Sequence, residues 1–241
     1  MALKISINRV YQKVLAIANK EQRGYITPQE FNLFADQAQM EIFEQYFYDI
    51  SQFSRVSSNS TEYSDMLGFL DEKLGIFKKT GNFSVGTNTQ GTFVNKPVDF
   101  YRVGSVYAES TGYDGNSYRT RFEEVDYKEY VQMSNSYLTR PTQKRPIYYI
   151  VDDKIILQPN QSGTVNMSYV RKLADVQWGY VVISDKAIWD ANNSVDFELH
   201  KSEETELVYK ILKLAGITLN KPGLSQSALN LEESKAQKEK Q

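Results

Sequence analysis

The single histidine of this 241-residue chain, His200, is the first residue to test for catalysis, because imidazole is the commonest general base in enzymes. It stands in "DFELHKSEE", beside Lys201 and Glu203, at the start of a predicted helix. A catalytic histidine needs a nucleophile or a metal partner, and no GxSxG or HExxH motif accompanies this one. The sequence therefore favours a surface or helix-capping role for His200.

Three pairs of adjacent carboxylates could supply a general acid and a general base. They are Glu123-Glu124, Asp152-Asp153 and Glu203-Glu204. The first pattern is typical of a strand end and the second of a turn. The third is typical of a first helical turn, where acidic groups complement the helix dipole. A glycosidase could also use two carboxylates far apart in sequence, so that class stays open.

Motifs for metals and cofactors are missing from the sequence. The chain has no cysteine, which excludes disulfides, thiolate nucleophiles and cysteine zinc sites. "DDKIILQPNQSG" lacks the alternating oxygen ligands of a calcium loop, and "GNFSVGTNTQG" lacks the spacing of a phosphate-binding loop. We therefore expect no catalytic residue, no cofactor and no metal, and we predict that the protein is not an enzyme.

Aromatic residues on predicted loops offer one more kind of site, a platform for sugar rings. The candidates are Tyr113, Tyr118, Trp178 and Trp189. Aromatic residues make up 13% of the chain, with 17 Tyr and 12 Phe. Packing in a sheet or an interface is the favoured role, because antiparallel strands are rich in these residue types.

The charge of the chain is nearly balanced, with 28 basic and 30 acidic residues spread without large blocks. Proteins that grip duplex DNA by its phosphates usually show a clustered basic excess, so we expect any DNA to slide past without being held. "MALKISINRVYQKV" carries charges inside its apolar stretch, unlike a signal peptide. Because no apolar run approaches the roughly 18 residues of a membrane span, we expect a soluble protein made in a cytoplasm.

A long helix is predicted to begin in "YITPQEFNLFADQAQMEIFEQYFYDI". Thr27 offers a hydroxyl at the N-cap, Pro28 takes the first helical position, and Glu30 follows three residues after the cap. This is a capping box with the proline that favours helix initiation. The apolar pattern continues to about Phe53, which gives a helix of roughly 26 residues.

Apolar residues form two stripes on this helix. The first comprises Phe31, Phe34, Ala35, Ala38, Ile42, Tyr46, Ile50 and Phe53, and the second comprises Leu33, Met40, Phe43 and Phe47. Two stripes imply two neighbours. Either the chain covers both stripes itself, or other copies of the chain help.

Helices are predicted at both ends of the chain and strands between them. One helix contains residues 7–18, a third spans about 61–79, and a closing helix follows Ser202. Between them, β-branched and aromatic runs alternate with turn signals such as Asp114-Gly115, and a short helix interrupts them at 126–138. These runs predict a meander of about five antiparallel strands. The expected fold class is α+β, with a discontinuous helical bundle from 1–80 and 200–241 and an inserted antiparallel β-domain at 81–199.

Several stretches, in this order, are similar to one family of virion proteins. They are "YITPQEFNLFADQAQMEIFEQYF", "KPVDFYRVGSVY", "RPIYYIVDDKIILQP", "GTVNMSYVRKLADVQWGY" and "SVDFELHKSEETELVYKILKLAGI". Together they resemble the head-to-tail connector proteins of short-tailed bacteriophages. These are the adaptor or ring proteins related to tail tubular protein A, including those of crAss-like phages. The resemblance spans roughly residues 20–220 and lies in the order of the pieces.

The resemblance implies a virion structural protein located at the head–tail junction and assembled in the cytoplasm of a bacterial host. About twelve copies would form a ring beneath the portal protein. The bore would pass the genome DNA without specific binding, and the lower face would receive the tail or a second ring protein. No catalytic residue, cofactor, metal or membrane contact is implied.

In such a ring, one stripe of the long helix would face its own bundle and the other a neighbouring subunit. The predicted bundle or ring contacts are Phe31, Phe34, Phe43, Phe47 and Tyr46, behind the helix cap formed by Thr27, Pro28 and Glu30. Family members often send a C-terminal segment into the portal. The weakly amphipathic tail from Leu224 is the segment that would do so here.

Two other function classes stay open. A carbohydrate-binding or depolymerising tail appendage would carry its aromatics on exposed β-loops, but it would not need long capped helices at both ends of the chain. A nucleic-acid-binding module is disfavoured by the dispersed charge. The sequence leaves open the copy number, the ring in the stack, the partners and host, the path of the tail, and the order of loop 110–120 before assembly.

Overall fold

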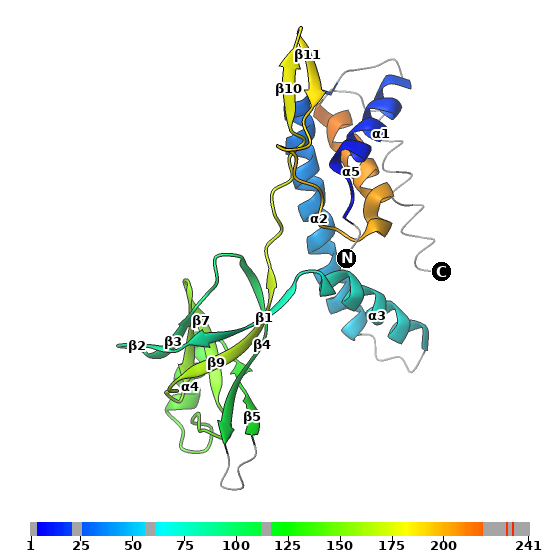
Figure 1. Cartoon of the computed structure of the whole chain (residues 1–241). Coiled ribbons are helices and arrows are strands. Elements are labelled where there is room, and N and C mark those ends of the chain that lie inside the picture. Colours follow the sequence, from blue (N-terminus) through cyan, green and yellow to red (C-terminus); the bar gives the residue numbers. More distant parts are fainter. Residues whose placement is uncertain are drawn as a thin grey trace. The chain divides into compact units, whose positions relative to one another are not determined.

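A computed structural model of the chain (Figure 1) describes residues 4–20, 26–55, 61–111 and 117–218, together with positions 230 and 233. The chain forms two compact units. Met1–Ile76 and Leu173–Gln241 make up one, here called the helical unit, and Phe77–Lys172 make up the other, the β unit. The predicted α+β class is confirmed, with helices contributed by both ends of the chain and mostly antiparallel strands between them.

The helical unit is built on three helices that share one core. These are α1 (Ile7–Lys20), α2 (Pro28–Arg55) and α5 (Glu204–Thr218), which follows the short 3-10 helix η1 (Lys201–Glu203). Helix α5 packs against both α1 and α2, and α3 (Thr61–Gly75) packs against α2. The apolar positions of α5 lie at helical spacing and are buried, which explains why neither end of the chain forms the core alone.

The predicted capping box at the start of α2 is confirmed. The Thr27 hydroxyl accepts a hydrogen bond from the Glu30 amide (3.3 Å), and the Glu30 carboxylate accepts one from the Thr27 amide (2.9 Å). The carboxylate also accepts from the Thr27 hydroxyl (2.8 Å). These bonds lower the pKa of Glu30, with the backbone bond as the largest cause. Pro28 is the first residue of the helix, as predicted.

The third helix is shorter than predicted. Its predicted span of 61–79 is wrong, because α3 ends at Gly75 and strand β1 (Lys78–Ser84) begins three residues later. Strand β1 pairs with β9 (Thr164–Arg171) along its whole length, from Lys78 opposite Val170 to Ser84 opposite Thr164. That pairing joins residues 80 to 92 positions apart in the sequence, so the local pattern around Lys78 could not reveal it.

The β unit contains two sheets, and the predicted simple meander is wrong. The first sheet has the order β1-β9-β4-β5 and the second has the order β2-β3-β8-β7-β6. The remaining strands are β2 (Gly86–Asn88), β3 (Gly91–Asn95), β4 (Phe100–Thr111), β5 (Ser117–Arg121), β6 (Glu123–Glu124), β7 (Ile147–Val151) and β8 (Lys154–Gln158). Among the described strands of this unit, all pairs are antiparallel except β6 with β7. Turn chemistry identified the hairpins β4–β5 and β7–β8, whereas β9 lies beside two strands that are distant in sequence.

Two hydrophobic clusters stabilise the β unit. The larger one draws on both sheets and contains Val94, Val106, Phe122, Tyr148, Ile155, Leu157, Val165, Met167 and Tyr169. The smaller one contains Val125, Ile147, Tyr149 and Ile156, and helix α4 (Tyr127–Ser134) packs against it through Tyr130 and Met133. Strands β7 and β8 are therefore buried on both faces, which explains the unbroken apolar runs "IYYI" and "IIL".

The unit boundaries differ from the predicted domain boundaries. The prediction placed the insertion at 81–199, whereas the compact β unit covers 77–172. Residues 173–199 belong to the helical unit and contain the hairpin β10 (Tyr180–Ile183) and β11 (Lys186–Trp189). The Asp114-Gly115 turn and the tail from Leu224 fall outside the described residues, apart from positions 230 and 233.

Candidate functional site

Two side-chain amides on α2 hold the segment that runs between the β unit and α5. The buried Gln39 donates its Nε2 to the Ala174 carbonyl and accepts at Oε1 from the Glu198 amide, both at 3.1 Å. Asn32 accepts from the Trp178 amide (2.7 Å) and donates to the Trp178 carbonyl (3.3 Å). A side-chain amide has a donor and an acceptor like a peptide group. Asn32 and Gln39 therefore satisfy backbone groups of this segment in the way that a neighbouring strand would.

The "DFEL" piece, 196–199, joins the two ends of the chain. The Asp196 carboxylate accepts from the amide of Ile7, the first residue of α1 (2.9 Å), and so satisfies a free N–H of that helix. Phe197 is fully buried and forms a bridge with Ile5. Glu198 accepts from the Ala174 amide (3.1 Å). This piece therefore stabilises the helical unit.

The carboxylates of Glu203 and Glu204 attach α5 to the rest of the helical unit. Glu203 is buried and lies 2.6 Å from Lys73 Nζ on α3. Glu204 is paired on α1 with Arg9 Nε (2.9 Å) and Lys13 Nζ (2.6 Å). Buried carboxylates need such partners, so the ion pairs of Glu203 and Glu204 have a structural role.

His200 has the capping role that its sequence context favoured. Its Nδ1 accepts a hydrogen bond from the Ser202 amide (3.3 Å), and it is the N-cap residue of η1. The same nitrogen lies 2.9 Å from the Ser202 hydroxyl. With both ring contacts directed to Ser202, this side chain organises the entry to α5.

The hairpin β10–β11 has apolar side chains on both faces, with Lys186 as the one charged residue of its two strands. Its register pairs Val181 with Ile188 and Ile183 with Lys186, so these four side chains share one face. Val181, Ile183 and Ile188 are 49%, 55% and 49% exposed. A solvent-facing strand surface normally carries polar residues, so this aliphatic face is unusual for an isolated chain.

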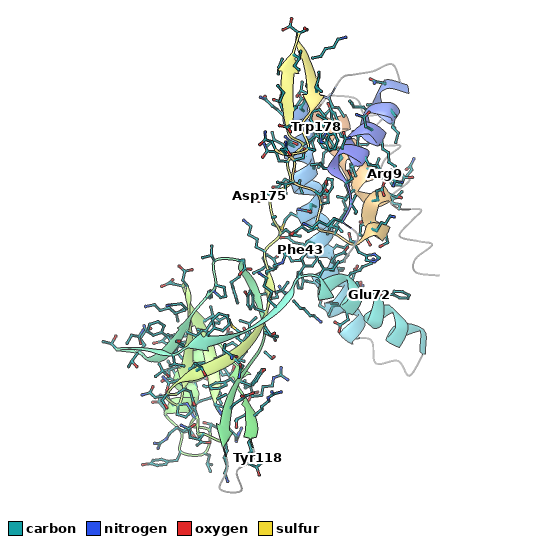
Figure 2. The ribbon with its side chains drawn as sticks, viewed as in Figure 1. Arg9, Phe43, Glu72, Tyr118, Asp175 and Trp178 are labelled. Atoms are coloured by element: carbon teal, nitrogen blue, oxygen red, sulfur yellow. The ribbon has the colours of Figure 1, made fainter. Side chains whose placement is uncertain are left out.

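Part of the opposite face of the hairpin looks onto α1, whereas Val182 on that face is 61% exposed. A hollow of about 440 Å³ lies between the hairpin and α1, lined by Tyr11, Gln12, Leu15, Trp178, Asp185, Lys186, Ala187 and Trp189. Trp178 is buried at the base of the hairpin (Figure 2), where its ring lies 4.3 Å from that of Tyr11 and its Nε1 donates to Asn8 Oδ1 (3.1 Å). Trp178 therefore packs in the core and is unavailable to a sugar ring.

Of the other candidates for a sugar platform, Trp189 lines the same hollow as Trp178, and Tyr118 lies in the other unit. Trp189 is 44% exposed and donates to the Ser194 hydroxyl (2.9 Å), whereas Tyr118 is an exposed residue of strand β5 in the β unit. Tyr113 lies outside the described residues. The favoured packing role is thus confirmed for Trp178, which is 2% exposed.

A second hollow, of about 430 Å³, lies in the β unit beside Glu123 and Glu124. The Tyr148 hydroxyl reaches this hollow and donates to Glu124 Oε2 (2.9 Å). Burial raises the pKa of Tyr148, and the hydrogen bond to Glu124 raises it further. Glu123 and Glu124 both line this hollow, and Glu124 is engaged by the Tyr148 hydroxyl.

Other kinds of site are not found in the part of the chain that the structure describes. There, no cluster of three or more His, Asp or Glu side chains is arranged to hold a metal ion. Among the described helices, none combines the length and apolar character needed to cross a membrane.

The five predicted contact residues of α2 divide by burial. Phe31, Phe43 and Tyr46 are buried, and Phe34 and Phe47 are half-buried. Rings of Phe43 and Phe47 meet edge to face at 5.1 Å, with Phe43 labelled in Figure 2. The buried residues pack within the bundle, and a ring contact by Phe34 and Phe47 stays a prediction.

The apolar side chains that α2 presents to solvent are different residues. Leu33 is 72% exposed and Tyr48 is 65% exposed. Sequence reasoning also missed Asn32 and Gln39. Their spacing of seven residues in an aromatic helix was a usable signal, since residues seven apart share one helix face.

No known protein family and no curated protein matches the sequence.

Proposed function

We propose that the protein is a virion structural protein that forms a connector ring between the portal and the tail of a short-tailed phage. In this role it is a conduit for DNA and a docking platform for neighbouring components. The observation that carries the proposal is the aliphatic face of hairpin β10–β11, formed by Val181, Ile183 and Ile188. A hairpin of two four-residue strands is marginally stable in water, and an uncovered aliphatic face gains stability when another chain covers it.

The fold supports the same proposal. A helical unit closed by both ends of the chain, with a β unit inserted, agrees with the architecture that the resemblance implies. Leu33 and Tyr48 on α2 and Phe69 on α3 add further exposed apolar side chains to the helical unit. Each of these side chains offers apolar area that a partner chain could bury.

The direct test is the mass of the purified protein in solution. We expect rings in light scattering after size exclusion and in negative-stain images of the same peak, either alone or after addition of the portal protein of the same phage. A 27.7 kDa monomer that does not bind the portal protein contradicts the proposal. Glycan binding by a monomer or trimer would favour the tail-appendage alternative.

A matched pair of variants tests the hairpin. Changing Val181, Ile183 and Ile188 to Thr keeps β-branched side chains. A hydroxyl then replaces a methyl group at Val181 and an ethyl group at Ile183 and Ile188. We expect normal thermal unfolding and loss of a docking contact, seen as failure to form the ring or to bind the portal. Val98→Thr, at an exposed position of the β unit, is the control and should leave both unchanged.

A further inference from the structure

Helix α2 presents an acidic surface with an apolar residue at each end. We name it the acidic α2 face and define it as Leu33, Asp36, Glu41, Glu44 and Tyr48, all exposed. From Ile26 to Ser54 the sequence has no Lys or Arg. At 1.5 Å per residue, the face extends roughly 22 Å from the first to the last of these residues.

The carboxylates of the acidic α2 face are only partly engaged within the chain. Glu41 lies 3.8 Å from Lys210 Nζ and accepts a hydrogen bond from Gln37. Among the described residues, Asp36 and Glu44 have no ion-pair partner. The face therefore keeps negative charge available to a cationic surface.

The β unit carries a surface of opposite charge in the loop after α4. We name it the basic loop and define it as Tyr137, Leu138, Arg140, Lys144 and Arg145. All five are exposed, with Tyr137 at 92% and Leu138 at 90%, and the Arg140 guanidinium stacks 4.5 Å from the Tyr137 ring centre. No Asp or Glu occurs between Tyr130 and Val151, so the positive charge of this loop has no neighbouring compensation in sequence.

Hydrogen bonds hold the basic loop in one shape. The Arg140 amide donates to the Ser136 carbonyl (3.0 Å), and the Thr139 hydroxyl donates to the Met133 carbonyl (3.2 Å). Thr142 and Arg145 exchange backbone hydrogen bonds of 3.3 and 3.0 Å. A loop fixed in this way presents its two apolar side chains at low entropic cost, as binding surfaces require.

We propose that the basic loop of one copy docks on the acidic α2 face of a second copy. The two surfaces match in kind, because each combines two exposed apolar residues, one of them a tyrosine, with three charges of one sign. Burial of the apolar pairs supplies affinity, and the opposite charges supply orientation and register. The β unit as a whole has more Lys and Arg than Asp and Glu, and the helical unit has the reverse, which favours the same pairing.

The proposed contact is heterologous, since the two partner surfaces are different. Every copy then offers one surface of each kind, and repetition of the contact gives a closed ring or an extended filament. The inference rests on the proposed ring function, which it extends by naming the residues of the contact between neighbouring copies.

Cysteine cross-linking tests the contact, because the natural chain has no cysteine. Leu33→Cys and Leu138→Cys are made singly and together, and each protein is oxidised and separated on a non-reducing gel. The double variant should form a ladder of linked chains, and a mixture of the two single variants should stop at the dimer. Each single variant alone should run as a monomer on the gel, because no second cysteine lies at its contact. The pair Leu33→Cys with Val98→Cys is the matched control and should give no ladder.

Charge reversal in the same background tests the electrostatic part. Arg140→Glu, Lys144→Glu and Arg145→Glu together should lower the ladder yield about tenfold, and so should Asp36→Lys, Glu41→Lys and Glu44→Lys. Mixing the two reversed proteins should restore the yield, because each then carries the partner that the other needs. Circular dichroism checks that both reversed proteins are folded.

The outcomes separate this inference from the proposed function. A wild-type ring, with no ladder from the double variant of Leu33→Cys and Leu138→Cys, overturns the contact and leaves the ring intact as a proposal. Absence of both ring and ladder overturns both. Cross-linking within one chain, linking by either single variant alone, or a DNA mobility shift that depends on the basic loop would also overturn the proposed contact.

Discussion

Replacing Phe31 by Ala separates a core role for this residue from a role in ring contacts. The side chain is 0% exposed, and its ring meets that of Tyr11 edge to face at 4.7 Å. A phenyl ring that buries roughly 150–250 Å² at about 25 cal/mol per Å² contributes roughly 4–6 kcal/mol, which is an upper bound. Core Phe→Ala changes usually cost about 3–5 kcal/mol. We expect a loss in this range, a large fraction of the roughly 5–15 kcal/mol that stabilises a domain.

The assay follows from the positions of the two tryptophans. Trp178 and Trp189 are the only tryptophans of the chain, and both belong to the helical unit. Tryptophan fluorescence during urea unfolding therefore reports on the unit that contains Phe31, without a signal from tryptophans in the β unit. Tyr11 links the mutated ring to Trp178, since it contacts both.

Leu33→Ala is the matched control, because Leu33 lies two residues away on the same helix and is largely exposed. Its free energy of unfolding should stay within about 0.5 kcal/mol of wild type. A Phe31→Ala protein that is less than about 1 kcal/mol weaker than wild type, yet fails to assemble, would refute the burial argument. It would instead place Phe31 at the subunit contact.

Three smaller changes test other parts of the structure. Thr27→Ala removes the capping bonds with Glu30 and should cost about 1 kcal/mol in urea unfolding followed by tryptophan fluorescence, whereas Thr27→Ser should be nearly neutral. Gly179→Ala should cost about 1–3 kcal/mol in the same assay, because its new Cβ would lie 2.5 Å from the backbone C and O of Asn193; an unchanged midpoint would contradict that close approach. The pKa of Asp99 is lowered, chiefly by a hydrogen bond from Lys79 (2.6 Å), so the folded β unit binds this proton less tightly than the unfolded chain. The resulting stability is complete above the ordinary carboxyl pKa and is lost as pH falls through the lowered one. Asp99→Asn should therefore be less stable than wild type at neutral pH and equal to it in acid, as measured by circular dichroism during urea unfolding.

Local signals in the sequence predicted the elements whose cause is local. The capping box at Thr27 fixed the start of α2, because its bonds join residues three apart. The pair Asp152-Asp153 marked the turn of hairpin β7–β8, where Asp152 adopts a positive φ of 49° that Asp tolerates better than most residues. His200 could be assigned to a cap for the same reason, since its partner is two residues away.

Long-range pairing lay beyond that reasoning. The first two residues of strand β1, Lys78 and Lys79, were predicted to end a helix, but the pairing of β1 with β9 decided their conformation. The domain boundary moved for a similar reason, because Asn32 and Gln39 draw the segment after Leu173 onto α2 through hydrogen bonds across more than 100 residues. The periodicity of apolar residues along the chain cannot identify partners that are distant in sequence.

The candidate surfaces divide in the same way. The sequence by itself determined that α2 would be long, capped and aromatic, and that it would lack basic residues over most of its length. Only the tertiary structure decided which aromatic residues face the core: α5 packs against α2, Tyr11 of α1 meets the Phe31 ring, and Phe31 and Phe43 are buried while Leu33 and Tyr48 stay exposed. Composition and helical spacing fix which residues share a face, whereas burial depends on the neighbour that the distant end of the chain supplies.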